Sequence, residues 1–314
     1  MKFMRINVEE AIEKLLANQL VAMPTETVYG LAARLTCPGA IKKIFEIKGR
    51  SLVNPLIIHV ANPIDVSAYA IALPPHFDAL THAFWPGPLT LIVPIQLDLV
   101  DSIVRAGLST AAFRMPSHPL TLHVIRAVGP LVMPSANLSG KPSSTDVKHV
   151  EMDFGLDFPV LDGGPCQEGV ESTILHYRNS QWEIARLGAL SATVFQPILG
   201  YEPIYQKIVK NDQIISPGQM FRHYAPQATL FLGDQKQITE ADFIVGFTEK
   251  PYPVEKRVLY LGSLSNPHEV AENLYAILRQ LDVEKAKIAW VDMDFPSEGL
   301  WKTIAERLSR AGEK

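Results

Sequence analysis

Short apolar runs of strand length recur along this chain between segments of helical periodicity, and this alternation most restricts its possible folds. It is most regular over residues 228–314. There TLFLG, DFIVGF and RVLYLG precede a helical pattern from about 267 to 281, and KIAWVDM precedes a last helix. Strands that alternate with helices favour βαβ units and a parallel sheet. Residues 228–314 are therefore predicted to form a smaller, Rossmann-like parallel α/β domain.

Residues 1–200 mix strands and helices without strict alternation. Asn7 can cap a first helix, with Glu10 as its capping-box partner. PLIIHV, LTLIV, TAAFRM and PLVMPS have the length and composition of strands, and STILHYRNSQWEIARL is typical of a hairpin that turns at Asn179-Ser180. These elements predict an α/β domain around a twisted, mixed open sheet. Residues 201–227 have little periodicity and contain SPG and AP, so they are predicted to be a linker.

Composition narrows the class of protein. The 314 residues suggest two domains, and the formal net charge of −4 argues against a broad nucleic-acid surface, which is normally basic. Cys37 and Cys166 form no CxxC pair, and the nine histidines lack metal-ligand spacing. We find neither a signal peptide nor an apolar run of membrane-spanning length. The sequence therefore predicts a soluble cytoplasmic protein.

Two cations and a histidine lie beside one buried strand. Lys48 and Arg50 flank Gly49, and His59 interrupts the apolar run LIIHV. The two cations could neutralise an anion that approaches the backbone at Gly49. They could equally be a solvated helix end, where cations favour the helix dipole. His59 is either a hydrogen-bonded core residue or a residue that faces a pocket at the strand edge.

A third cation, Arg114, lies inside the apolar run STAAFRM. A buried guanidinium needs an anionic partner, which could be an internal carboxylate or a bound carboxylate or phosphate. The segment MPTETVYGL places Thr25, Glu26 and Thr27 at the end of a strand, where open α/β sheets bind ligands. A simple turn or helix cap would use the same residues.

A hydroxyl-rich loop follows another strand in MPSANLSGKPSST. It contains Ser135, Asn137 and Ser143, and it suits phosphate binding or a plain surface loop. Ser172 begins a later strand in GVESTIL and forms another possible site edge. The sequence contains no Walker A, GxGxxG, GxSxG or HExxH motif.

Together these motifs resemble one family. PTETVYGLAA, KGR, NPLIIHV, FWPGPLTLIV, AFRMPSHP, MPSANLSGKPSST and GVESTIL occur in the order found in YrdC-like L-threonylcarbamoyladenylate synthases. SPGQMFRHYAP and the domain after it resemble the long, two-domain form. The resemblance covers nearly the whole chain and is densest over residues 20–190.

The resemblance implies an ATP-using nucleotidyltransferase. It would join L-threonine, bicarbonate and ATP into threonylcarbamoyl-AMP and release pyrophosphate. A partner transferase complex would then modify an adenosine next to the anticodon of tRNA, which the synthase itself would bind weakly if at all. Mg²⁺ would be held mainly by ATP phosphates and water.

Site residues also follow from the resemblance, by motif position. The catalytic set falls on Lys48, Arg50, Ser135 and Asn137. The ATP contacts fall on Arg50, Asn54, Thr110, Ser135, Ser143, Arg186 and Tyr224. The threonine contacts fall on Thr27, His59, Arg114, Ser172 and the backbone of Met133. Leu187 stands where the family pattern RPGA has proline, which is a departure beside Arg186.

A labile acyl-adenylate needs protection from water, and the linker over 201–227 is rich in aromatic residues. We therefore predict that it folds over the pocket as a lid, with the aromatic residues Tyr201, Tyr205, Phe221 and Tyr224. Two other functions fit parts of the pattern. One is an RNA-binding maturation module, which the negative net charge disfavours. The other is a carbamoyl-transfer module, which the second domain disfavours.

Overall fold

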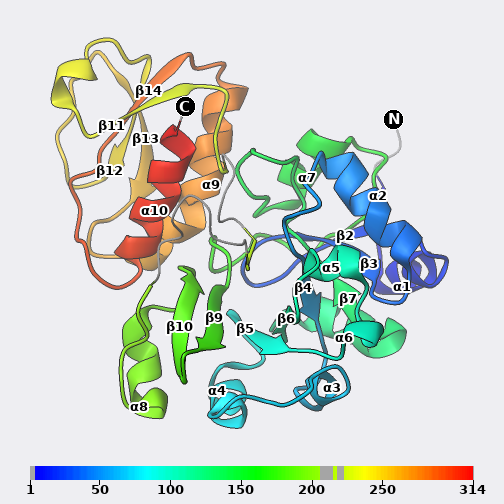
Figure 1. The fold of residues 1–314 in the computed structure, drawn as a ribbon. Coiled ribbons are helices and arrows are strands. Elements are labelled where there is room, and N and C mark those ends of the chain that lie inside the picture. Colours follow the sequence, from blue (N-terminus) through cyan, green and yellow to red (C-terminus); the bar gives the residue numbers. More distant parts are fainter. Residues whose placement is uncertain (1–3, 206–214, 218–222, 314) are drawn as a thin grey trace.

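The computed structural model describes residues 4–205, 215–217 and 223–313, and it contains two sheets flanked by helices (Figure 1). The first part of the chain forms a mixed ten-stranded sheet, and the last part forms a parallel four-stranded sheet. This arrangement confirms the predicted fold class. None of the helices among the described residues is long and apolar enough to cross a membrane.

The large sheet has parallel and antiparallel neighbours. Its strands, in sheet order, are β1 (Arg5–Ile6), β8 (Val160–Leu161), β2 (Val21–Met23), β3 (Gly30–Arg34), β7 (Leu131–Val132), β4 (Ile57–His59), β6 (Thr110–Arg114), β5 (Leu89–Pro94), β9 (Thr173–Arg178) and β10 (Gln181–Arg186). The helices of this part are α1 (Val8–Leu16), α2 (Pro38–Lys48), α3 (Ile64–Ser67), α4 (Phe77–Phe84), α5 (Ser102–Arg105), α6 (Pro119–Val128), α7 (Val147–Phe154) and α8 (Gln196–Leu199), with 3₁₀ turns η1 (Leu97–Leu99) and η2 (Ala192–Phe195).

The small sheet is parallel throughout. Its order is β11 (Thr229–Leu232), β14 (Ile288–Val291), β12 (Phe243–Phe247) and β13 (Arg257–Gly262), accompanied by α9 (Pro267–Val283), α10 (Trp301–Gly312) and the 3₁₀ turn η3 (Gln235–Gln237).

Both faces of the large sheet are buried. Val21 and Met23 of β2 pack in a cluster with α1 and α6, whereas Ala22 between them belongs to the cluster that includes α2. Successive side chains of a strand point to opposite faces, so both clusters draw on the same strand. This explains why the strands read as nearly continuous apolar runs.

Several local predictions are confirmed. Asn7 and Glu10 form the capping box of α1. The β9–β10 hairpin turns through Asn179 and Ser180, both with positive φ, as two-residue hairpin turns require. The sequence did not predict β1, β3 or β8. β1 and β8 are two residues long and pair with each other from opposite ends of the first domain, so neither carries a local pattern.

The two parts of the chain share a hydrophobic core. The cluster built on α9 and α10 also includes Val28, Val170 and Ala189, which come from loops around the large sheet. The domain boundaries at residues 200 and 227 stay predictions. Within the linker, Phe221 and the ranges 206–214 and 218–222 lie outside the described residues.

Gly169 marks a close approach between the backbones of the two parts. Its φ is +67°, and an added Cβ would lie 2.2 Å from the carbonyl oxygen of Ala271 in α9. Gly169→Ala should therefore lower the free energy of unfolding by about 2–5 kcal/mol, through left-handed strain and overpacking together. Chemical denaturation at pH 7 measures this loss.

Gly164→Ala is the matched control, because Gly164 lies nearby with a φ of +78° but has no described atom within 4 Å of its would-be Cβ. Only the strain remains there, about 1–2 kcal/mol. Equal losses in the two variants would contradict a close approach at Gly169.

Candidate active site

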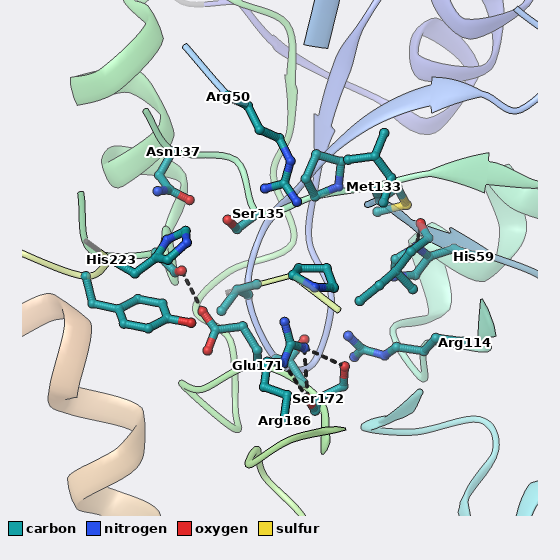
Figure 2. Close-up of a pocket in the computed structure, with 18 of the residues that line it drawn as sticks. Arg50, His59, Arg114, Met133, Ser135, Asn137, Glu171, Ser172, Arg186 and His223 are labelled. Atoms are coloured by element: carbon teal, nitrogen blue, oxygen red, sulfur yellow. Dashed lines mark hydrogen bonds between the residues drawn. The ribbon is translucent and has the colours of Figure 1, made fainter. Parts of the chain in front are cut away.

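One pocket brings together most of the predicted site residues (Figure 2). It lies where β4, β6 and β10 end, and loops after β2 and β7 and residues of the linker complete its wall. The predicted residues that line it are Thr27, Arg50, His59, Arg114, Met133, Ser135, Asn137, Ser143, Ser172, Arg186 and Tyr224. Lys48, Asn54 and Thr110 are not among its lining residues.

His59 and Arg114 reach the pocket because their strands are parallel neighbours. β4 and β6 pair with His59 opposite Arg114, at the last residue of each strand. His59 is buried, and its Nδ1 lies 3.2 Å from the carbonyl oxygen of Ile57. Burial, together with the positive charge of Arg114, lowers the pKa of His59 to about 3. The imidazole is therefore a neutral group in the pocket wall at physiological pH.

The partner of Arg114 is an internal carboxylate. Its Nη2 donates to Glu26 Oε1 at 2.7 Å, and both side chains are buried. The other oxygen of Glu26 accepts from the Ser117 backbone N–H at 3.0 Å. Arg114 Nε donates to the carbonyl of Gly87, so Nη1 is the nitrogen not used in these contacts. Arg114 is thus held rigidly and also lines the pocket.

Neither Arg50 nor Arg186 forms an ion pair with a carboxylate in the described part of the chain, although Glu171 lies near enough to Arg186 to oppose the lowering of its pKa. Arg50 donates to the carbonyl oxygens of Asn54 and Pro55, and Arg186 donates to the carbonyl and hydroxyl oxygens of Ser172. Burial lowers the pKa of both groups, and the proximity of Arg186 lowers the pKa of Arg50 further. Guanidinium groups held in this way favour a bound anion as the missing counter-charge.

Lys48 occupies a different place from the one that its position beside Arg50 suggested. At the end of α2 it is 3% exposed, and its Nζ donates to the carbonyl oxygens of Ser135, at 2.5 Å, and Asn137. Burial holds the pKa of Lys48 well below its ordinary value. In this structure Lys48 supports the loop after β7 from behind and does not face the pocket.

In the hydroxyl-rich loop after β7, Asn137 lines the pocket and has a buried polar atom with no hydrogen-bond partner among the described residues. Asn137 Nδ2 donates to the carbonyls of Leu138 and Lys141, but its buried Oδ1 has no partner in the described structure. His223, from the linker, also lines the pocket, and its Nε2 is likewise buried and unpaired among described groups. Buried polar atoms are normally satisfied, so both are suited to a ligand.

Sequence reasoning missed three ionisable residues of the pocket. These are Lys141, which pairs with Asp153 at 3.0 Å, His223 and Glu171. His223 precedes Tyr224 in RHYAP, so the motif itself could have suggested it. Glu171 precedes Ser172 in GVEST, but nothing local shows that this carboxylate is buried beside the pocket.

The enclosed space is small, about 60 Å³. Pockets that hold small organic ligands usually measure about 300–1,000 Å³. Side chains at the rim must therefore move when a larger ligand enters. Among the described residues no group of three or more His, Cys, Asp or Glu side chains could hold a metal ion.

Known proteins match both parts of the chain. Residues 13–188 match the family of Sua5, YciO and YrdC, described as "Telomere recombination", and residues 184–312 match "Threonylcarbamoyl-AMP synthase, C-terminal domain". The threonylcarbamoyl-AMP synthase of Bacillus subtilis is 37% identical over 97% of this chain and 92% of its own length. That of Pyrococcus abyssi is 35% identical over 98% and 96%.

Solved structures agree with the sequence comparison. P. abyssi Sua5 complexed with L-threonine has a TM-score of 0.89 at 33% identity, and the match covers 97% of this chain and 94% of that one. E. coli YciO, at 18% identity and a TM-score of 0.52, matches 58% of this chain and shows the fold alone. The fold and its relatives define an enzyme of the nucleotidyltransferase type. The chain belongs to the YrdC-like threonylcarbamoyl-AMP synthase family, in the long form that carries the Sua5 C-terminal domain.

The buried imidazole of His59 predicts a pH-dependent stability. Its pKa is lowered to about 3 in the folded chain, so between pH 6.5 and 3 the unfolded chain binds a proton that the folded chain does not. This contribution destabilises the fold as pH falls below about 6.5. Between pH 7.5 and 5.5 the loss amounts to about 1.4 kcal/mol.

His59→Gln removes this titration. When the pH falls from 7.5 to 5.5, wild type should therefore lose about 1.4 kcal/mol more unfolding free energy than the variant. Denaturant titration of both proteins at both pH values measures this. A difference independent of pH would contradict a buried, neutral His59.

Proposed function

We propose that this chain makes threonylcarbamoyl-AMP from L-threonine, bicarbonate and ATP and releases pyrophosphate. The observation that carries the proposal is the pair of guanidinium groups, Arg50 and Arg186, in one pocket without a carboxylate partner among the described residues. A polyphosphate supplies the missing negative charge. The relatives that cover nearly the whole chain bear the name of this activity.

Threonine is assigned to the end of the pocket at β4 and β6. Arg114 would bind the amino-acid carboxylate through the nitrogen that Glu26 and Gly87 leave unused. Neutral His59, Thr27, Ser172 and the Met133 backbone would surround the rest of the amino acid. The Pyrococcus relative, whose solved structure contains L-threonine, supports this class of substrate.

The nucleotide is assigned to the end formed by Arg50, Arg186, the Ser135–Asn137 loop and Ser143. Tyr224 of the linker lies at this end and stacks on Tyr275 with ring centroids 5.2 Å apart. Lys48 would contribute through the loop carbonyls that it holds. Asn54 and Thr110 stay predicted ATP contacts. Neither lines the pocket in this structure, so each would have to move toward the ligand to contact it.

The proposed reaction needs no covalent enzyme intermediate. Bicarbonate takes up a proton and loses water to give CO₂. The threonine amine then adds to CO₂ and loses a proton, and a carbamate forms. A carbamate oxygen then attacks the α-phosphorus of ATP, and the bond to the leaving pyrophosphate breaks. Arg50 and Arg186 would offset the charge that grows on the phosphates, while Arg114 fixes the amino acid in line.

Mg²⁺ is proposed to arrive with ATP as part of the substrate. Glu171 is the one carboxylate that lines the pocket in the described residues, and its oxygens already accept from Ser143, Tyr275 and Arg307. The described residues thus offer no free carboxylate set there, and phosphates and water would hold the ion.

The product would pass to a separate tRNA threonylcarbamoyl transferase complex, for modification next to the anticodon. Three described residues of the linker, Pro217, His223 and Tyr224, line the pocket and support a cover over the nucleotide. Tyr201 and Tyr205 of the predicted lid do not line the pocket and pack against the core of the first part of the chain. Phe221, which belongs to the same prediction, lies outside the described residues.

Pyrophosphate release tests the proposed function. With ATP and Mg²⁺ present, it should require both L-threonine and bicarbonate, and mass spectrometry should detect threonylcarbamoyl-AMP. Release that depends on carbamoyl phosphate instead would favour a carbamoyl-transfer enzyme. Salt-sensitive RNA binding without turnover would favour an RNA-binding module.

Substitution of Arg114 tests the assignment of the two ends. Arg114→Ala should raise the KM for threonine at least ten-fold more than the KM for ATP, because the carboxylate loses its positively charged hydrogen-bond donor. Arg114→Lys keeps a positive charge beside Glu26 and controls for the effect of leaving that buried carboxylate unpaired. Equal increases of both KM values in Arg114→Ala would remove Arg114 from the threonine site.

A further inference from the structure

Glu171 poses an electrostatic problem for a pocket that binds anions. It lines the pocket with its side chain 8% exposed, and a carboxylate there would repel phosphates. The structure resolves the problem through the C-terminal part of the chain. Arg307 of α10 donates through Nε to Glu171 Oε2 at 2.9 Å, and Tyr275 of α9 donates to the same oxygen at 2.9 Å.

The neutralised carboxylate in turn holds a predicted nucleotide contact. Ser143 Oγ donates to Glu171 Oε1 at 2.7 Å, so the orientation of this hydroxyl depends on the carboxylate. The positive charges of Arg307 and Arg186 lower the pKa of Glu171 to about 2 although burial opposes this. Glu171 is thus an ionised acceptor whose charge is balanced from behind the pocket wall.

Arg307 reaches two further parts of the same wall. Its Nη2 donates to the carbonyl of Leu187 at 2.7 Å, directly after Arg186. Its guanidinium carbon lies 5.0 Å from the ring centroid of Tyr224, and the ring of Tyr224 stacks on Tyr275. One buried guanidinium therefore contacts the three segments that carry Glu171, Arg186 and Tyr224.

We propose that Arg307 and Tyr275 are positioning residues for the nucleotide, so that the C-terminal domain completes the ATP end of the active site. Arg307 offsets the charge of Glu171, although its Nη1 also pairs with Glu306, and Tyr275 fixes the orientation of the Glu171 carboxylate. Ser143, Arg186 and Tyr224 are thereby held facing the phosphates and the nucleoside. Within the described part of the chain, neither residue forms a hydrogen bond with the threonine-end residues Thr27, His59, Arg114 or Ser172. This inference rests on the proposed function for the identity of the nucleotide.

Direct binding measurements test the proposal on the full-length protein. By isothermal titration with MgATP, Arg307→Gln should bind ATP at least ten-fold more weakly than wild type, because Glu171 remains as an unpaired negative charge in the wall. Its affinity for L-threonine, measured separately, should change less than three-fold. Equal losses for both ligands, or an unchanged ATP affinity, would overturn the proposal.

A charge rescue separates electrostatic positioning from damage to the fold. Adding Glu171→Gln to Arg307→Gln removes the uncompensated charge, so the double variant should bind ATP at least three-fold more tightly than the single variant. A double variant that binds no better than Arg307→Gln would overturn the role of charge balance.

Thr303→Val is the matched interface control. Thr303 lies one turn before Arg307 on α10 and donates to the carbonyl of Gly188, so its loss weakens the same interface and leaves Glu171 paired. The ATP affinity of Thr303→Val should stay within about two-fold of wild type. A ten-fold loss in this variant would show that any damage to the interface weakens ATP binding, and it would overturn the specific role of Arg307.

A wild-type chain that binds ATP but makes no threonine-dependent pyrophosphate would contradict the proposed function, while the comparison of ATP affinities would still decide this inference.

Discussion

Buried positive charge is the constraint on which the rest of this structure depends. Arg114 and Arg186 are buried and Arg50 is half-buried where the three converge on one pocket, and burying such groups is costly unless hydrogen bonds and counter-charges surround them. The chain answers with Glu26 for Arg114 and with backbone carbonyls for the other two. The positive charges are therefore neutralised to different degrees at the two ends of the pocket. The end at Arg114 holds a guanidinium paired with a carboxylate, and the end at Arg50 and Arg186 keeps positive charge for an anionic ligand.

The same constraint links the two parts of the chain. A shared hydrophobic core joins them, and polar contacts run through it to the pocket wall. Arg279 of α9, for example, pairs with Asp153 at 2.8 Å and donates to the carbonyl of Pro142, beside the hydroxyl-rich loop. Arg279 and Arg307 thus each pair with a carboxylate from the first part of the chain. The C-terminal part therefore contributes to the shape of the site as well as to stability.

Local sequence signals predicted the elements well and the contacts less well. Strand runs such as LIIHV, the capping box at Asn7 and the turn at Asn179 act within a few residues, so each is visible in the sequence. Lys48 shows the limit of this approach. Its position next to Arg50 suggested a shared anion, yet the helix end aims its ammonium group at loop carbonyls behind the pocket. Which side of a helix end a side chain takes depends on what packs against it, and that is not a local property.

By itself the sequence determined the two sheet types, the mixed and the parallel, and most of the lining of one pocket. Apolar periodicity and turn chemistry fix such elements, and the motif resemblance placed the pocket residues on them. Only the tertiary structure decided how the charges are balanced. The partners Glu26 and Arg114, and Glu171 and Arg307, are far apart in sequence and meet because the strands and helices that carry them pack together. An ion pair depends on distance in space, which the order of residues does not encode directly.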